Sequence, residues 1–157
     1  MVLTKTIINP DEKTKICNTI LRALPRWFGV EASIVDYTNQ VRHMPFFVVL
    51  SEGVPVGFVA LKPHSSFATE IYVMGILGEY HRKGIGKQLI ADCEQYCKEN
   101  HIEFLTVKTL DETRESESYQ STRAFYLAMG FKPLEVFPLY WDADNPCLLM
   151  VKHIASG

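Results

Sequence analysis

The sequence predicts an α/β layered domain. Stretches rich in β-forming residues, such as FFVVL and IEFLTVKTL, alternate with stretches whose apolar residues recur at helical spacing. The expected order is a strand, two helices, three strands, a helix, a strand, a helix and two strands, which is typical of a layered α/β domain. The chain has 157 residues, of which 47% are hydrophobic. This length and composition predict one domain over residues 1–157.

The first elements are marked by prolines. A short strand is expected over residues 4–10, and Asn9 can cap a helix whose first residue is Pro10. The apolar residues that follow recur at helical spacing, and Pro25 should end or kink this helix. A second, shorter helix is expected around residues 34–41.

Three strands in series are expected next, over residues 46–50, 56–62 and 67–77. Between the first two, SEGVP is expected to form a hairpin turn in which Gly53 takes a positive φ. In the third strand the side chains alternate between two faces. One face carries Glu70, Tyr72, Met74 and Ile76.

The second half of the chain alternates helices and strands again. A helix is expected from Gly86 to about Asn100, followed by a central apolar strand over residues 102–110. A last helix over residues 119–129 is expected to end at Gly130, which can adopt the left-handed conformation of a helix cap. The two final strands are expected over residues 134–141 and 147–154.

The composition argues against several classes of partner. The formal net charge is −2, so no broad positive field would attract nucleic acid or anionic lipid. The first residues lack a signal-peptide pattern and no stretch reaches about 20 apolar residues, so we expect a cytoplasmic protein without membrane contact. The cysteines and histidines show no metal-ligand spacing, and we expect no metal site. Cys93 and Cys97 are expected to be buried as small apolar residues.

The stretch YHRKGIGKQLI, residues 80–90, has the features of an anion-binding turn. It joins an expected strand to an expected helix, and the first N–H groups of a helix have no acceptor within it. Gly84 and Gly86 allow the backbone to approach a phosphate closely. The side chains that can add positive charge are His81, Arg82, Lys83 and Lys87. The stretch has neither the third glycine of a dinucleotide fold nor the G-K-[ST] ending of a nucleotide phosphate loop.

In this context H-R-K-G-I-G, residues 81–86, resembles the pyrophosphate loop Q/R-x-x-G-x-G/A of the GCN5-related N-acetyltransferase (GNAT) family. His81 stands where the family has Gln or Arg. A second family cue, at the end of the last helix, is present as Phe125, Tyr126, Gly130 and Phe131. Tyr119 stands where many relatives have an Asn that contacts the cofactor. The resemblance extends over residues 4–154 and implies a GNAT-type acyl-CoA N-acyltransferase fold, with a mixed central sheet flanked by helices.

The resemblance implies that acetyl-CoA binds as a cosubstrate. The residues that would hold its pyrophosphate are His81, Arg82, Lys83, Gly84, Ile85, Gly86 and Lys87. In the family, the strand before this loop splays from its neighbour, and its backbone binds the pantetheine arm and the acetyl oxygen. The corresponding residues here are Met74, Gly75 and Ile76. Gly75 suits a bulge at this point, and a glycine that is merely tolerated in the strand is the other interpretation.

Acetyl transfer to an amine also needs a base and an acid. An alkyl ammonium has a reference pKa of about 10.4, so it must lose a proton before it can attack. Relatives often place a glutamate at the position of Glu70, which implies a base acting directly or through water; a strand glutamate paired with a cation is the alternative. The resemblance implies that Tyr126 contacts the cofactor and protonates its departing thiolate, and a core tyrosine is the alternative.

The predicted function is therefore an acetyl-CoA-dependent N-acetyltransferase that acts on a primary amine of a small molecule or peptide, by direct attack in a ternary complex. A non-catalytic acyl-CoA-binding sensor or regulatory module is the alternative. The acidic loop of residues 111–117 either attracts a cationic amine or is simply solvated. Tyr72 and the aromatic residues near the first helices either line the acceptor side or pack in the core. Apolar residues in the last strands are compatible with a homodimer.

Overall fold

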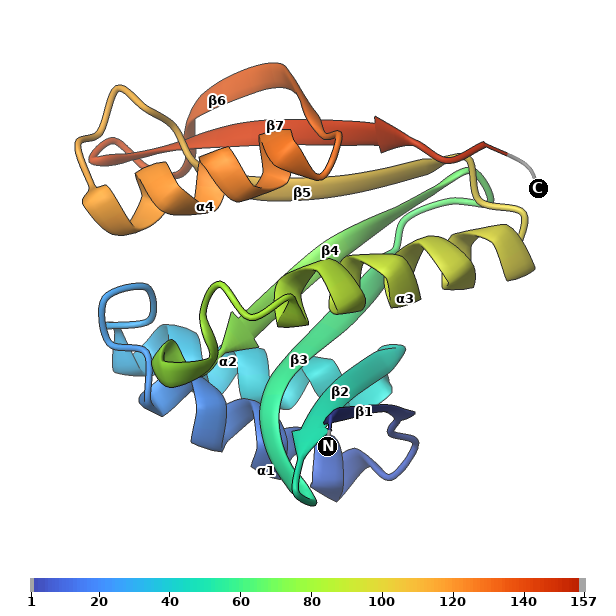
Figure 1. Cartoon of the computed structure of the whole chain (residues 1–157). Helices are drawn as coiled ribbons and strands as arrows, with labels where there is room; N and C mark the ends of the chain where they lie inside the picture. Colours follow the sequence, from blue (N-terminus) through green and yellow to red (C-terminus); the bar gives the residue numbers. More distant parts are fainter. Residues whose placement is uncertain (1, 156–157) are drawn as a thin grey trace. The chain divides into compact units, whose positions relative to one another are not determined.

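The computed structural model describes residues 2–155, and the chain divides into two compact units (Figure 1). Unit 1 contains residues 2–62 and 72–93, and unit 2 contains residues 63–71 and 94–155. The strand β4 (Ala68–Ile76) and the helix α3 (Ile85–Glu99) each contribute several residues to both units, and β3 (Val54–Pro63) lies in unit 1 except for its last residue. The single domain expected over the whole chain stays a prediction.

The other elements of unit 1 lie before β4 and in the turn that follows it. They are β1 (Val2–Thr6), α1 (Pro10–Arg22), α2 (Glu31–Gln40), the 3-10 helix η1 (Val41–His43), β2 (Phe46–Ser51), β3 (Val54–Pro63) and the 3-10 helix η2 (Gly78–Tyr80). β2 pairs antiparallel with both β1 and β3. Gly53 forms the turn between β2 and β3 with a φ of 79°, which confirms the predicted hairpin.

Helix α1 begins as the sequence predicts but ends earlier. The side chain of Asn9 accepts a hydrogen bond from the backbone N–H of Glu12 at 3.0 Å. The last helical residue is Arg22, although the apolar spacing continues to Phe28. Because a proline disfavours the helical conformation of the residue before it, Pro25 ends the helix ahead of itself instead of kinking it.

The core of unit 1 lies between α1 and the strands β2 and β3. Ile20 and Leu21 of α1 are buried, as are Phe46 and Phe58 of the strands. The rings of Phe46 and Phe58 are stacked, with centroids 5.2 Å apart and an interplanar angle of 11°. Burial of each such side chain contributes roughly 1.5–3 kcal/mol, which holds the helix against the strands.

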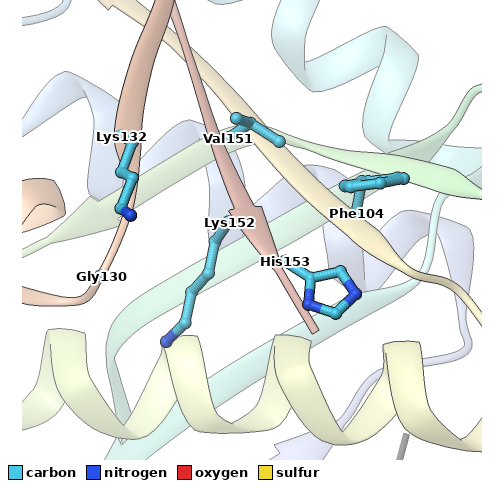
Figure 2. A pocket seen from close by; sticks show the side chains of 6 residues that line it. All are labelled: Phe104, Gly130, Lys132, Val151, Lys152 and His153. Atoms are coloured by element: carbon cyan, nitrogen blue, oxygen red, sulfur yellow. The ribbon is translucent and has the colours of Figure 1, made fainter. Parts of the chain in front are cut away.

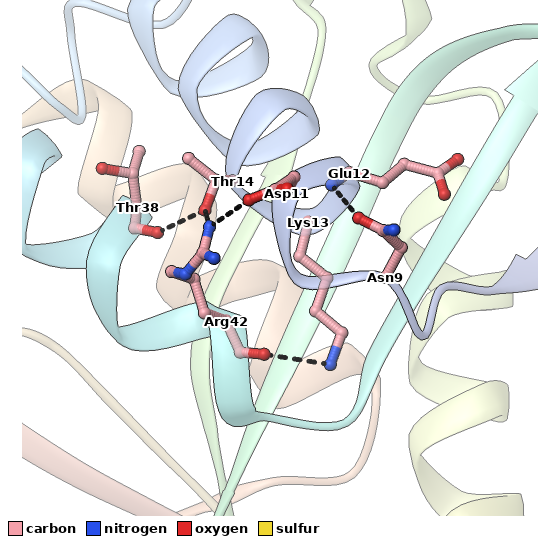
Figure 3. Close-up of polar contacts among 7 residues, drawn as sticks. All are labelled: Asn9, Asp11, Glu12, Lys13, Thr14, Thr38 and Arg42. Carbon is pink, nitrogen blue, oxygen red and sulfur yellow. Dashed lines mark hydrogen bonds and ion pairs between the residues drawn. The ribbon is translucent and has the colours of Figure 1, made fainter.

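A polar cluster joins α1 to η1 (Figure 3). Lys13 is only 7% exposed, and its Nζ donates to the carbonyl oxygen of Met44 at 2.7 Å. Arg42 donates to the carboxylate of Asp11 at 2.9 Å. Because burial lowers the pKa of Lys13, the unfolded chain holds this proton more tightly than the folded chain. The contribution of this group to stability therefore rises as the pH increases.

Replacing Lys13 with alanine is expected to destabilise the protein by about 1–3 kcal/mol, because the carbonyl of Met44 loses its buried donor. Lys15→Ala, at an exposed position of the same helix, is the matched control. It should change the free energy of unfolding by less than about 0.5 kcal/mol. Urea unfolding of the two variants measures the difference, and equal stabilities would show that the Lys13 contact contributes nothing.

Unit 2 is built on β5 (Phe104–Leu110), which pairs in parallel with the first half of β4 and antiparallel with β7 (Asn145–His153). The helix α4 (Glu117–Ala128) is capped by Ser116, whose hydroxyl accepts from the N–H of Tyr119 at 3.3 Å. Gly130 follows α4 with a φ of 95°, as predicted for a helix cap. The strand β6 (Lys132–Asp142) bows away from β7 between residues 137 and 142, where their pairing is interrupted (Figure 1).

The strands form one seven-stranded mixed sheet in the order β1-β2-β3-β4-β5-β7-β6. β5 lies inside the sheet between β4 and β7, which agrees with its apolar sequence, although the middle strand of the seven is β4. The predicted α/β class, with a mixed sheet flanked by helices, is therefore confirmed. Within residues 2–155, no helix combines the length and the apolar character needed to cross a membrane.

Candidate functional site

The predicted anion-binding turn connects η2 to α3 in unit 1. Arg82 and Gly84 have positive φ angles of 62° and 80°, so the backbone turns tightly before the helix. The N–H of Gln88 donates to the carbonyl of Gly84 at 3.1 Å, which closes the first turn of the helix. The N–H groups of residues 85–87 precede this bond, and such groups have no acceptor within their own helix. They make a local positive end that suits an anion.

The residues of this turn add cations beside an accessible backbone. Arg82, Lys83 and Lys87 are exposed. A β-carbon added at Gly84 would meet no atom within 4 Å, so the space beside this part of the backbone is open. Ile85 is buried and anchors the start of α3. The turn therefore offers hydrogen-bond donors, positive charge and open space to an anion, and its contact with the diphosphate of a coenzyme stays a prediction.

His81, at the first position of the loop motif, binds the protein itself. Its Nε2–H donates to the carbonyl oxygen of Ile76 at 2.7 Å. Its ring also meets Trp27 edge-on, with centroids 5.6 Å apart. The imidazole therefore ties the loop to the end of β4. A contact between His81 and the cofactor stays a prediction.

The strand residues predicted to bind the arm of the cofactor are Met74, Gly75 and Ile76. Met74 and Ile76 are partly buried, and Gly75 is buried. A β-carbon at Gly75 would lie 3.0 Å from Ile20 and 3.1 Å from Phe58. The glycine therefore allows α1 and β3 to pack closely against β4. The alternation of side chains along the strand gives no sign of this requirement. The expected bulge at this point stays a prediction.

Glu70 is the buried member of a polar network in unit 2. Only 6% of its surface is exposed. Its Oε1 accepts from Nζ of Lys108 at 2.9 Å and lies 2.6 Å from Nε2 of His64. Nζ of Lys108 is in turn 5.1 Å from the ring centre of Tyr140. Glu70 thus pairs with a cation, which is one of the two arrangements that the sequence leaves open.

Burial and neighbouring groups determine the protonation states of Lys108 and Cys147 in this network. Burial lowers the pKa of Lys108, but its hydrogen bond to Glu70 and the charge of Glu70 outweigh burial, so the net shift is upward. Cys147 on β7 is fully buried, which raises the pKa of its thiol to about 11. At neutral pH Lys108 is therefore an ammonium and Cys147 a neutral thiol. Oε1 of Glu70 is the atom that His64 and Lys108 share.

Tyr126 lies on α4 in unit 2, with 5% of its surface exposed. Its ring meets Phe125 and Phe131 edge-on, at centroid distances of 5.3 and 5.4 Å. These contacts fix the ring, which both a catalytic tyrosine and a core tyrosine require. Of the predicted residues, Tyr126 and Glu70 belong to unit 2, and residues 74–76 and 81–87 belong to unit 1.

Two partners of Glu70 are missing from the candidates that the sequence provides. Lys108 lies two positions after Thr106, the residue that pairs with Glu70 in the parallel β4–β5 ladder. The register of such a ladder is not readable from spacing along the chain, so no signal could have found Lys108. A turn connects His64 to the strand that carries Glu70. In this turn the N–H of His64 donates to the carbonyl of Ala68 at 3.0 Å. Recognition of this turn could have brought His64 and Glu70 together.

The aromatic residues that the sequence left unassigned mainly pack on one another in unit 1. Phe46 is fully buried in the core. The ring of Tyr37 meets Phe28 and Tyr72 edge-on, at centroid distances of 5.8 and 5.3 Å. Nζ of Lys62 lies 5.6 Å from the ring centre of Tyr72, which is itself only partly buried. Packing is therefore shown for these rings, and a contact with an acceptor stays a prediction.

Two hollows occur on unit 2. The first, of about 330 Å³, is lined by Phe104, Gly130, Lys132, Val151, Lys152 and His153 (Figure 2). The ammonium of Lys152 already has a partner in this hollow, because its Nζ donates to the carbonyl of Met129 at 2.6 Å. The second, of about 690 Å³, lies beside the start of α4 and has Glu112, Glu115 and Glu117 in its lining. These carboxylates belong to the acidic loop of residues 111–117. The sequence left open whether this loop attracts a cationic amine or is simply solvated.

Comparison with known proteins supports the motifs. The model of the acetyltransferase (GNAT) family matches residues 15–131. A search of curated proteins by sequence finds no match. The structure is similar to that of a GNAT-family protein from Desulfovibrio desulfuricans, with 14% identity, a TM-score of 0.84, and 99% of this chain and 100% of that chain covered.

Two further similar structures belong to enzymes with named acceptors. The ribosomal-protein-S18-alanine N-acetyltransferase from Escherichia coli shares 16% identity at a TM-score of 0.77, with 100% of this chain and 96% of that chain covered. An aminoglycoside 6′-N-acetyltransferase complexed with coenzyme A shares 17% identity at a TM-score of 0.76, with 99% and 97% covered. At these identities the likeness shows the fold, whereas the family match spans most of the chain. The chain belongs to the acetyltransferase (GNAT) family.

Proposed function

We propose that this chain transfers the acetyl group of acetyl-CoA to a primary amine of a small molecule or peptide, by direct attack within a ternary complex. The observation that carries the proposal is the turn before α3. It combines a positive φ at Gly84, open space beside that residue and three exposed cationic side chains. Membership of the GNAT family supplies the reaction class.

The cosubstrate would be held mainly by backbone. The N–H groups at the start of α3 would bind the diphosphate, and Arg82, Lys83 and Lys87 would add charge around it. Backbone groups of Met74, Gly75 and Ile76 would bind the pantetheine arm and orient the thioester. Such positioning lowers the barrier because the two reactants then meet in a fixed geometry.

Two side chains of unit 2 would move the protons. The acceptor ammonium must lose a proton before its nitrogen can attack, and Glu70 is the carboxylate proposed to draw that proton away. The nitrogen then forms a bond to the thioester carbonyl carbon, and the C–S bond breaks with its electron pair on sulfur. Tyr126 would donate its hydroxyl proton to that sulfur, and the second proton of the attacking nitrogen would restore the hydroxyl.

The alternative is an acyl-CoA-binding sensor without turnover. The pairing of Glu70 with Lys108 and the burial of Tyr126 are also what purely structural residues would show. The two functions differ in one observable, which is the release of free CoA in the presence of an amine.

The deciding experiment is a panel of amines with acetyl-CoA and a free-thiol readout. The panel contains spermidine, kanamycin, lysine and a short peptide with a free amino terminus. Release of CoA that depends on one of these amines supports the enzyme. Binding of acetyl-CoA without release for any amine supports the sensor, and a thermal shift with ATP but not with acetyl-CoA would contradict both.

The thiols of the native protein should not react in this free-thiol assay. All four cysteines are buried. Burial raises the pKa of Cys17 to about 12 and that of Cys97 to about 11. Because the thiolate is the reactive form, fewer than about one thiol per native chain should react with DTNB during an assay. Unfolding in guanidinium should release all four, and rapid reaction in the native state would contradict the burial.

Three properties expected from the sequence stay predictions for this enzyme. They are the cytoplasmic location, the homodimer and the absence of nucleic-acid and membrane partners. Size-exclusion chromatography with light scattering tests the homodimer directly.

A further inference from the structure

We propose that His64 is the group that takes the proton from the acceptor ammonium, and that Glu70 is the residue that positions its ring. This inference rests on the proposed N-acetyltransferase function and refines it. It replaces a glutamate that acts alone with a pair, in which the carboxylate orients an imidazole.

The geometry of the pair supports this division of roles. Oε1 of Glu70 lies 2.6 Å from Nε2 of His64 and 2.9 Å from Nζ of Lys108. One carboxylate oxygen therefore already serves two neighbours of the same unit. An ionised carboxylate can only accept hydrogen bonds, so its contact with His64 places the proton on Nε2. The lone pair of the neutral ring is then on Nδ1, and a carboxylate that fixes a base in this way is a recurrent catalytic arrangement.

Exposure also favours the imidazole as the group that meets the acceptor. The side chain of Glu70 is 8% exposed, whereas that of His64 is 41% exposed. A proton taken by Glu70 would have to leave from a buried carboxyl that holds Lys108. A proton taken by His64 can pass directly to water. An imidazole is also suited to this task because one ring nitrogen can donate to the carboxylate while the other accepts the proton.

The other groups around the pair do not compete with it for the proton of the acceptor ammonium. Lys108 on β5 contributes the positive charge that accompanies the Glu70 carboxylate. Tyr140 on β6 lies over the ammonium of Lys108, and Cys147 on β7 has a thiol whose pKa is raised by burial to about 11. At neutral pH the lysine is already protonated and the thiol is neutral. The proton can therefore go to the Glu70 carboxylate, which already accepts from Lys108, or to the more exposed His64, and exposure assigns it to His64.

The proton and electron balance of the step is as follows. The ammonium gives one proton to Nδ1 of His64, and the neutral nitrogen forms its bond to the thioester carbonyl carbon. The C–S bond breaks, its electron pair leaves on sulfur, and the hydroxyl proton of Tyr126 goes to that sulfur. The second proton of the attacking nitrogen restores the hydroxyl of Tyr126. His64 returns its proton to water, so one proton is released for each amide formed.

The test compares His64→Gln with the native protein, using the amine of the panel that turns over fastest. Glutamine keeps an N–H that can donate to Glu70 but cannot take a proton. We expect kcat/KM to fall about 100-fold at neutral pH and the acidic limb of its pH profile to disappear. The affinity for acetyl-CoA should not change. Added imidazole should restore part of the activity of His64→Ala, which a purely structural role would not produce.

His153→Gln is the matched control, because His153 is an exposed histidine of the same unit at the end of β7. It should keep the native kcat/KM and pH profile. Native kcat/KM in His64→Gln, with the native protein active, would overturn the role of His64 and leave the proposed function standing. If no amine of the panel turns over with the native protein, the proposed function itself fails, and the role of His64 fails with it.

Discussion

Replacing Tyr126 with phenylalanine is expected to lower kcat about 100-fold, because the thiolate of CoA loses its proton donor in the transition state. The affinity for acetyl-CoA should remain unchanged. The change removes one hydroxyl and keeps the ring, which meets Phe125 and Phe131 at 5.3 and 5.4 Å. Steady-state kinetics measure kcat, and calorimetric titration measures the dissociation constant of acetyl-CoA.

Tyr96→Phe is the matched control for this prediction. Tyr96 lies in the second half of α3, is partly buried and has a pKa raised by burial. Its substitution removes the same atom from a residue without a proposed catalytic role. The acid role of Tyr126 would be wrong if Tyr126→Phe turned over at the native rate, or if both variants lost the same fraction of activity.

Replacing Gly84 with valine is expected to weaken acetyl-CoA binding by a factor of about 10 or more, because a lost charge-assisted hydrogen bond costs roughly 1.5–3 kcal/mol. Gly84 has a φ of 80°, a conformation that a β-branched residue rarely adopts. The backbone must therefore change at the residue directly before α3, and the N–H groups that follow it are redirected. Titration calorimetry with acetyl-CoA measures the effect.

Gly53→Val separates binding from general strain. Gly53 has a φ of 79°, and a β-carbon there would also meet no atom within 4 Å. Both substitutions should therefore destabilise the fold by a similar amount, on the order of 1–2 kcal/mol. Only Gly84→Val should weaken acetyl-CoA binding. Equal affinities in the two variants would show that the turn before α3 does not hold the cosubstrate.

Features decided by nearby residues could be predicted from the sequence. Asn9 as a helix cap, Gly53 in the hairpin and Gly130 after α4 all depend on the conformational preferences of a few residues. The alternation of β4 is visible in its burial from Ile71 to Ile76, whereas Glu70, on the same face as Tyr72, is buried as well. The loop motif likewise depends on local spacing, so its position before a helix was predictable.

Features decided by packing between distant segments could not be predicted. Gly75 is required because Ile20 and Phe58 approach it to within 3.1 Å, which depends on how α1 lies against the strands. The pairing of Glu70 with Lys108 depends on the register of the parallel β4–β5 ladder. Hydrophobic patterns specify which face of a strand is buried but leave such a register open.

The central claim is that backbone N–H groups at the start of α3 bind the diphosphate of acetyl-CoA. A crystal structure of the protein with acetyl-CoA tests this claim most directly. We predict diphosphate oxygens within about 2.7–3.2 Å of backbone nitrogens between residues 84 and 87. A diphosphate bound elsewhere, or a start of α3 covered by the protein's own side chains, would contradict it.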